Sequence, residues 1–303
     1  MSIKVKGLVK LYGEQKALDG ISFEVHPGEI VGFIGPNGAG KTTTMKILTG
    51  YTMPDSGEAA VNGQSIADDP LQVRKNIGYL PEHNPLYLEM YIKEYLEYVS
   101  GLYGLGRQTP ERIREVIDLA GLEKEKHKKI GALSKGYRQR TGLAQAIIHD
   151  PGVLILDEPT SGLDPNQIKE IRTMISRLGK QKTVLLSTHI MQEVEAICDR
   201  IIIINNGRIV ADDRVENIHK TVHENKQTVQ VEFDKEVTGD QLKKIDVVNQ
   251  IRRIDGKNWL IESLEEQDVR QRIFDFAVES GLAVLSMQKK EKSLEEVFHD
   301  LTK

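Results

Sequence analysis

A glycine-rich segment between an apolar run and a helical run carries the clearest chemical pattern in this sequence. It fits G-x-x-x-x-G-K-[ST], the loop that holds the phosphates of a nucleoside triphosphate. Its glycines allow backbone conformations in which consecutive N–H groups point at the phosphates. Lys41 can reach the β- and γ-phosphates, and the Thr42 hydroxyl can ligate Mg²⁺. The residues predicted to form this phosphate site are Gly35, Pro36, Asn37, Gly38, Ala39, Gly40, Lys41, Thr42 and Thr43.

The flanks of this loop agree with a phosphate site. The apolar run Ile30–Ile34 predicts a buried strand, and Thr42–Leu48 predicts a helix whose positive N-terminal end faces the anion. An ordinary glycine-rich turn between a strand and a helix is the alternative. The strand and helix in their expected places favour the phosphate loop.

Two acidic residues follow a second apolar run, Val153–Leu156, which is typical of a parallel strand covered on both faces. Asp157 can hold Mg²⁺ across from Thr42. Glu158 would face the γ-phosphate, where a carboxylate can act as general base for an attacking water. An Asp-Glu pair alone is weak evidence, because strands often end in acidic turns. A phosphate loop upstream in the same domain makes the catalytic interpretation the stronger one.

Two further side chains have both a structural and a nucleotide-binding interpretation. His189 ends the predicted strand Thr183–Ser187; it is either a hydrogen-bonded structural histidine or a contact to the γ-phosphate that orients water. Tyr12 lies upstream of the phosphate loop at the end of a strand. It is either a half-buried edge aromatic or a ring that stacks on adenine.

The amino-acid composition indicates a globular protein and argues against several other classes. The chain has 303 residues, of which 39% are hydrophobic and 28% charged, as in globular proteins with an adequate core. The net charge of −4 leaves no basic excess for a phosphate backbone, so nucleic acid is an unexpected partner. No apolar run reaches the roughly 18 residues of a membrane span, so we expect no direct membrane insertion. One cysteine, Cys198, and no visible secretion signal indicate a reducing compartment.

Strands and helices alternate up to about residue 220, which predicts a doubly wound α/β domain. Helical patterns span Tyr91–Ala120, with a break at Gly101–Thr109. From about Lys226 the pattern changes to short strands and helices in the order β-α-β-β-α-β, which predicts a small α+β plait of the ferredoxin-like kind. We therefore expect two domains, residues 1–220 and residues 221–303.

Six of the nine tyrosines fall between Tyr79 and Tyr103. The helical spacing of Tyr91, Tyr95 and Tyr98 is explained equally well by core packing and by a partly exposed surface for a partner.

An ordered series of motifs over residues 1 to about 220 resembles one family, the ATP-binding subunits of ABC transporters. Beyond the phosphate loop and the Asp-Glu pair, Glu82 matches the loop that senses the γ-phosphate, and His189 matches the switch histidine. Leu133–Tyr137 matches the family signature, and Ser161–Asp164 matches the D-loop. The resemblance implies a phosphate-loop ATPase fold with a helical subdomain. It also implies that Tyr12, Ser134, Gly136 and Asp164 belong to the nucleotide site.

This sequence departs from the family pattern at two places. The signature is usually Leu-Ser-Gly-Gly-Gln, and here it is Leu-Ser-Lys-Gly-Tyr, with the phosphate-facing Ser134 and Gly136 retained. The sensing loop usually carries glutamine, whereas here Glu82 is expected near Mg²⁺. The phrase Tyr79–Tyr87 resembles the gliding-motility-associated branch of the ABC-2 exporter group, and Ser293–Phe298 is similar to the tails of ABC-2 ATPases.

The resemblance implies a subunit that binds and hydrolyses ATP with Mg²⁺ to power a membrane transporter. The metal ligands would be Thr42, Asp157 and Glu82, and the catalytic residues Glu158 and His189. Two copies, or a pair of ATPase subunits, would form a head-to-tail dimer with two ATP between phosphate loop and signature. Permease subunits in the membrane are the implied partners. The implied location is cytoplasmic, peripheral on the inner face of the cell membrane.

Two other classes of protein are less compatible with the sequence. A soluble non-transport ABC-type ATPase acting on ribosomes or DNA usually carries two ATPase halves or a long coiled coil, and this chain shows neither. A GTP-dependent switch protein would need Asn-Lys-x-Asp to read guanine, but Asn225–Thr228 lacks the aspartate. The sequence does not name the transported substrate.

Overall fold

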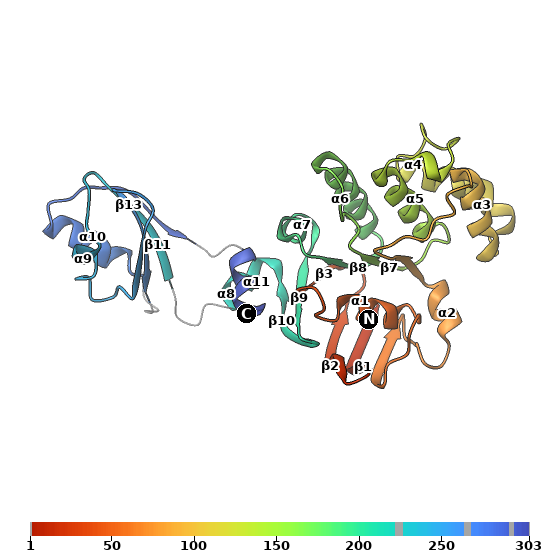
Figure 1. Ribbon diagram of the computed structural model, residues 1–303, viewed down its shortest axis with the longest axis horizontal. Helices are drawn as coiled ribbons and strands as arrows, with labels where there is room; N and C mark the ends of the chain where they lie inside the picture. Colours follow the sequence, from red (N-terminus) through yellow and green to blue (C-terminus); the bar gives the residue numbers. More distant parts are fainter. Residues whose placement is uncertain (1, 222–226, 264–267, 291–293, 303) are drawn as a thin grey trace. The chain divides into compact units, whose positions relative to one another are not determined.

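The computed structural model describes residues 2–221, 227–263, 268–290 and 294–302 (Figure 1). The chain divides into two compact units, Met1–Val215 and Glu216–Leu301. The boundary expected at residue 220 falls within helix α8 (Val215–Thr221), which begins at the junction of the units. Three positions named in the sequence analysis, Asn225, Lys226 and Ser293, lie outside the described residues.

A six-stranded sheet runs through the first unit in the order β10-β9-β3-β8-β7-β6. The strands from β9 to β6 are parallel, and β10 pairs antiparallel with β9 at one edge. Strands β3, β7 and β8 are buried at every position, which explains the continuous apolar runs Ile30–Ile34 and Val153–Leu156 and the apolar centre Val184–Leu186 of β8. The bounds are β3 (Ile30–Ile34), β6 (Ile77–Leu80), β7 (Val153–Asp157), β8 (Thr183–Thr188), β9 (Arg200–Asn205) and β10 (Arg208–Arg214).

A second, antiparallel sheet of the same unit has the order β2-β1-β4-β5. Its strands are β1 (Ile3–Tyr12), β2 (Gln15–Val25), β4 (Ser56–Val61) and β5 (Gln64–Ser65). The hydrophobic pattern of the sequence indicates these first two strands only around residues 3–9 and 21–25, whereas both strands are longer in the structure. The hairpin turns at Gly13, whose φ of 60° favours glycine, and cross-strand pairing extends to Tyr12 and Gln15. Polar residues at the exposed tip hid this extension from the hydrophobic pattern.

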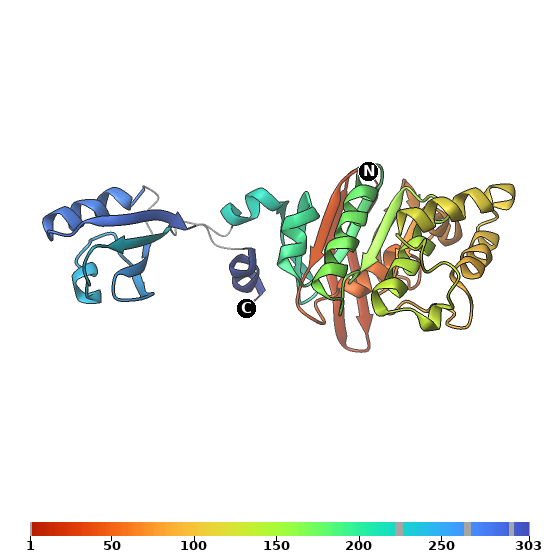
Figure 2. The ribbon, with the colours of Figure 1, turned by 90° about the horizontal axis from the view of Figure 1, so that it is seen from above.

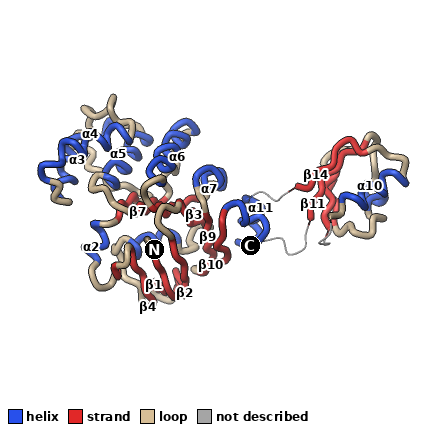
Figure 3. The backbone as a smooth tube through the Cα atoms, turned by 180° about the vertical axis from the view of Figure 1, so that it is seen from behind, coloured by secondary structure: helices blue, strands red, loops and turns tan. Residues whose placement is uncertain are grey.

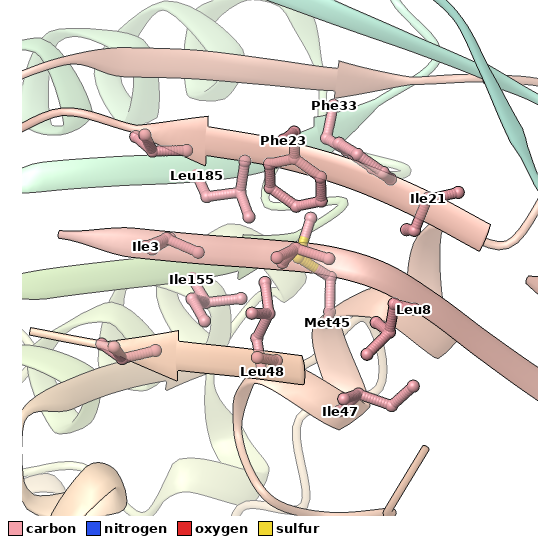
Figure 4. Close-up of a cluster of buried hydrophobic side chains, with 14 of the residues drawn as sticks. Ile3, Leu8, Ile21, Phe23, Phe33, Met45, Ile47, Leu48, Ile155 and Leu185 are labelled. Atoms are coloured by element: carbon pink, nitrogen blue, oxygen red, sulfur yellow. The ribbon is translucent and has the colours of Figure 1, made fainter. Parts of the chain in front are cut away.

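Helix α1 (Lys41–Leu48) lies between the two sheets, and its inner residues join them into one core. Figure 4 shows Met45 and Leu48 of α1 among side chains of both sheets, including Phe23 of β2 and Ile155 of β7. Each of these four side chains is 5% exposed or less. Burial of such side chains stabilises by roughly 1.5–3 kcal/mol each, so this packing fixes where the phosphate loop at the start of α1 lies.

Three helices, α3 (Ile92–Leu102), α4 (Thr109–Leu119) and α5 (Lys135–Ile147), contact one another and form the helical subdomain. The helical pattern in the sequence of α5 is recognisable only from Thr141 onward. The helix begins six residues earlier because Ser134 caps it, accepting a hydrogen bond from the Tyr137 N–H at 3.4 Å. The remaining segments of this unit are α2 (Pro70–Lys75), α6 (Pro165–Gly179), α7 (Met191–Ile197), and the 3₁₀ turns Gly106–Gln108 and Ile130–Ala132.

Helices α5 and α6 lie on the opposite side of the six-stranded sheet from β1 and β2 (Figures 1 and 2). The parallel strands are thus covered on both faces, as expected for a phosphate-loop α/β fold. Among the described residues, no helix is long and apolar enough to cross a membrane.

The second unit contains a four-stranded antiparallel sheet in the order β12-β13-β11-β14, with helix α10 against one face (Figure 3). Its chain order, β11-α9-β12-β13-α10-β14, is the plait predicted from the sequence. A separate core, which includes Val231, Trp259 and Ile273, holds the sheet to its helices. The bounds are β11 (Gln227–Phe233), α9 (Gly239–Leu242), β12 (Gln250–Arg253), β13 (Asn258–Ser263), α10 (Arg270–Glu279), β14 (Val284–Lys290) and α11 (Leu294–Thr302).

Candidate functional site

The loop between β3 and α1 has the backbone that the sequence predicted for a phosphate site. Gly40 precedes α1 with a φ of 113°, and a Cβ there would lie 2.6 Å from the Ala17 carbonyl oxygen, so only glycine fits. The Ala39 N–H donates to the Pro36 carbonyl at 3.1 Å, which closes the loop on itself. The loop is therefore held in one shape by the protein alone.

Lys41 crosses the inside of this loop. Its ammonium donates to the carbonyl oxygens of Gly35 at 2.7 Å and Pro36 at 3.2 Å, and the residue is only 7% exposed. Two neutral carbonyl oxygens leave the positive charge uncompensated. A phosphate entering the loop would therefore find a buried cation already in place.

Asp157, at the end of β7, is 1% exposed, and the Ser187 hydroxyl of β8 donates to its Oδ1 at 2.5 Å. Its other oxygen, Oδ2, is buried, and no donor among the described residues makes a hydrogen bond to it. A buried carboxylate oxygen without a donor is costly unless something else satisfies it, and a hard cation such as Mg²⁺ would do so. Among the described residues there is no cluster of three or more His, Cys, Asp or Glu side chains, so phosphate and hydroxyl oxygens would have to complete such a site.

Sequence reasoning missed Ser187. Its hydroxyl also accepts the Glu158 N–H at 3.0 Å, so it positions both acidic residues. The only signal for this role was its place two residues before His189. Parallel pairing of β7 and β8 sets Asp157 opposite Ser187, and that register was not visible in the sequence.

Glu158 is the next residue, and it has an unusual backbone conformation. Its φ is 49°, in the left-handed region that non-glycine residues rarely adopt. The Glu158 N–H donates to Ser187, and the Glu158 carbonyl accepts the Ser161 N–H at 3.2 Å, so the strain is held on both sides. Burial raises the pKa of the Glu158 carboxyl, and His189 and Lys41 oppose that shift.

His189 meets Glu158 directly. The distance between His189 Nδ1 and Glu158 Oε2 is 2.8 Å, and the histidine side chain is 58% exposed, on the open side of the site. The structure therefore joins these two predicted residues in a pair that can bind and relay a proton.

Most residues of the predicted phosphate loop, together with Glu158 and His189, line one cavity of about 500 Å³. Its lining consists of Asn37, Gly38, Gly40, Lys41, Thr42, Thr43, Glu82, Glu158, Ser161 and His189. A neighbouring cavity of about 740 Å³ shares Thr42 and Glu82 and is also lined by Asp157. The three predicted metal ligands thus line this second cavity together. Ser161 was not among the predicted site residues, although it lies within the matched D-loop.

Seven predicted nucleotide-site residues do not line either cavity. Three of them, Gly35, Pro36 and Ala39, belong to the phosphate loop itself, and the other four are Tyr12, Ser134, Gly136 and Asp164. Tyr12 is 51% exposed at the end of β1, with the Lys10 ammonium 5.7 Å from its ring centre. Asp164 caps α6, accepting the N–H groups of Asn166 and Gln167 at 3.0 Å each.

The other two residues belong to the signature segment. Ser134 caps α5 on an exposed surface, while Gly136 is buried against the Gln167 side chain of α6. Within one chain, the signature and the phosphate loop therefore stay apart.

Comparison with known proteins is consistent with this site. The ABC transporter family profile matches residues 18–161. The chain is 35% identical to the uncharacterized ABC transporter ATP-binding protein YxlF of Bacillus subtilis, over 98% of each chain. It is 34% identical to the bacitracin transport ATP-binding protein BcrA of Bacillus licheniformis, over 98% of this chain and 95% of the relative.

A third relative matches a shorter part. The Nod factor export ATP-binding protein I of Ralstonia nicotianae is 40% identical over 70% of this chain and 67% of its own length. Among solved structures, the ATP-binding cassette MJ0796, a dimer in a post-hydrolysis state bound to ADP and Pi, has a TM-score of 0.65 at 26% identity. That match covers 70% of this chain and 98% of the cassette. The chain therefore belongs to the family of ABC transporter ATPases, the ATP-binding subunits of ABC transporters.

Proposed function

We propose that this protein is the ATP-hydrolysing subunit of an ABC-2 type exporter. The observation that carries the proposal is the single cavity around which the Lys41 ammonium, Glu158 and His189 meet. Relatives named for bacitracin transport and Nod factor export support the transport class. The closer likeness to the gliding-motility-associated branch remains a prediction from the phrase Tyr79–Tyr87.

In the proposed reaction, the amides of the phosphate loop and Lys41 bind the phosphates of ATP. Glu158 removes a proton from the attacking water, which its raised pKa favours, and His189 holds the γ-phosphate side of the site. Thr42, Asp157 and Glu82 would hold Mg²⁺, whose positive charge stabilises the negative charge on the phosphates when it is bound. The unpartnered Oδ2 of Asp157 supports this assignment.

A single chain leaves the ATP site incomplete, because Ser134, Gly136 and Asp164 lie outside the cavity. We infer that a second subunit supplies these residues in a head-to-tail dimer, so that two ATP lie between phosphate loop and signature. Tyr12 would stack on the adenine. The exposed ring of Tyr12 and the exposed cap at Ser134 support contacts that form only when nucleotide and partner arrive.

The cavity of about 740 Å³ lies beside the ATP site, with Tyr103 in its lining. Tyr95 is buried, as core packing requires, whereas Tyr87, Tyr91 and Tyr98 are 51%, 47% and 42% exposed and accessible to a partner. Exposed tyrosines favour protein interfaces. Permease subunits would dock here, and the protein would act in the cytoplasm at the inner face of the cell membrane.

The second unit holds none of the predicted site residues. Residues 221–303 would form an accessory domain that modulates or dimerises the ATPase. Its own buried core, separate from the core around α1, supports an independent fold.

The experiment that tests the proposed function is ATP hydrolysis by the purified chain. Wild type should release phosphate from ATP in a Mg²⁺-dependent manner, and Lys41→Ala should abolish both ATP binding and turnover. Hydrolysis that persists in Lys41→Ala would refute the assignment of the site.

A further inference from the structure

The turn between β8 and α7 carries His189 and is closed by three hydrogen bonds. The buried Thr188 hydroxyl donates to Glu193 Oε2 at 2.8 Å and accepts the Ile190 N–H at 3.1 Å. The Glu193 N–H donates to the Ile190 carbonyl at 3.0 Å. His189 itself is largely exposed, so little packing restrains its ring. Its position against Glu158 therefore depends on the shape of this turn.

The buried carboxylate of Glu193 is energetically unfavourable in this turn. The Glu193 side chain is 1% exposed, and none of the described residues makes a hydrogen bond to Oε1. Arg172 of α6 supplies the nearby positive charge, with Nη2 3.9 Å from Glu193 Oε1. The Arg172 Nε likewise has no hydrogen-bond partner within the described part of the chain. A buried ion pair this loose does little to repay the desolvation of its charges. Stability therefore does not explain why a carboxylate lies here.

We propose that Thr188 and Glu193 are positioning residues for His189, with Arg172 as the nearby countercharge of Glu193. This inference rests on the proposed function, in which Glu158 and His189 act on ATP. Glu193 anchors the Thr188 hydroxyl, and the hydroxyl anchors the Ile190 N–H. The two neighbours of His189 are thereby fixed, and Nδ1 is held 2.8 Å from Glu158 Oε2.

Strand β8 provides a matched pair of variants for the test. Thr188→Val removes the anchoring hydroxyl at one end of the strand. Thr183→Val removes an equally buried hydroxyl at the other end, where it pairs with the Ser2 hydroxyl at 2.8 Å and accepts the Gly28 N–H at 3.1 Å. Both variants lose two hydrogen bonds, but the bond to the Glu193 carboxylate is the stronger one, so the melting temperature of Thr188→Val should fall further than that of Thr183→Val.

Only the variant near His189 should change the reaction. We expect Thr188→Val to lower kcat about tenfold or more with KM for ATP changed less than about twofold, because a misplaced group weakens the transition state and not ground-state binding. Glu193→Gln should give a smaller fall of the same kind, and Thr188→Ser, which keeps the hydroxyl, should restore most of the rate. Thr183→Val should keep the wild-type kcat.

A second readout does not depend on activity. In protein with ¹⁵N-labelled histidine, the His189 ring signals, assigned with His189→Gln, should shift in Thr188→Val and stay unchanged in Thr183→Val. Equal kcat values and equal His189 signals in the two threonine variants would overturn the positioning role. If wild type shows no Glu158-dependent hydrolysis but the His189 signals still shift only in Thr188→Val, the proposed function fails and the positioning role stands.

Discussion

Substitution of Ser187 by alanine should destabilise the first unit and impair the site at once. The Ser187 hydroxyl donates to the buried Asp157 carboxylate at 2.5 Å and accepts the Glu158 N–H at 3.0 Å. A hydrogen bond to a charged group contributes about 1.5–3 kcal/mol, and its loss leaves both oxygens of Asp157 without a donor. The Glu158 N–H keeps a second contact, to the Ser187 carbonyl at 3.2 Å, so the loss of the other bond costs little. We expect a total loss of about 2–3 kcal/mol in the free energy of unfolding.

Thr160→Val is the matched control. Thr160 is 2% exposed in the same region, but its hydroxyl has no hydrogen-bond partner in the part of the chain that the structure describes, so valine should be neutral or slightly stabilising. Urea unfolding followed by circular dichroism measures both variants without nucleotide. The chain's one tryptophan, Trp259, lies in the second unit, so its fluorescence transition should stay unchanged. A Ser187→Ala variant as stable as Thr160→Val, or a shifted Trp259 transition, would refute the reasoning.

Three further predictions concern the reaction. The rate of hydrolysis should fall as pH drops through the pKa of Glu158, because a general base must be deprotonated. Burial raises that pKa, so the acid limb of a pH–rate profile should lie above the ordinary glutamate range. An acid limb within the ordinary range would contradict the burial argument. Ser134→Arg should abolish turnover while the monomer still binds ATP, as measured by calorimetry, and loss of ATP affinity in the monomer would exclude a signature that acts from the partner subunit. Glu82→Gln should preserve hydrolysis, whereas Glu82→Ala should require more Mg²⁺ for half-maximal rate; superimposable Mg²⁺ titrations of Glu82→Ala and wild type would place Glu82 outside the metal site.

Much of the fold was predictable where burial leaves a simple pattern. Strands β3 and β7 are buried on both faces, so each contains a continuous apolar run that ends at, or one residue before, the last residue of the strand. The start of α5 was not predictable in this way. Its first turn holds Lys135, Gly136 and Tyr137, which show no helical hydrophobic pattern. The helix starts there because the Ser134 side chain caps it by accepting the Tyr137 N–H.

The functional site shows the same contrast between residues that could be predicted from the sequence and residues that could not. Residues that must be one type for chemical reasons, such as Lys41 in the loop or Glu158 after the strand, were visible in the sequence. The residues that hold them were not. Ser187 acts through the register between two parallel strands, and Glu193 acts through a turn and a neighbouring helix. Such roles depend on tertiary neighbours, and common serine and glutamate residues give no local signal for them.

The central claim is that Glu158 is the base of an ATPase whose closed state is a dimer, and one measurement tests both parts. Glu158→Gln keeps the size of the side chain and its place beside His189, but a neutral amide cannot take a proton from water. We predict that hydrolysis falls by about 10²-fold or more while ATP binding persists. Light scattering after size-exclusion chromatography with Mg²⁺ and ATP should then show a stable dimer of Glu158→Gln and a largely monomeric wild type. Near-normal turnover, or a variant that stays monomeric with ATP bound, would contradict the account.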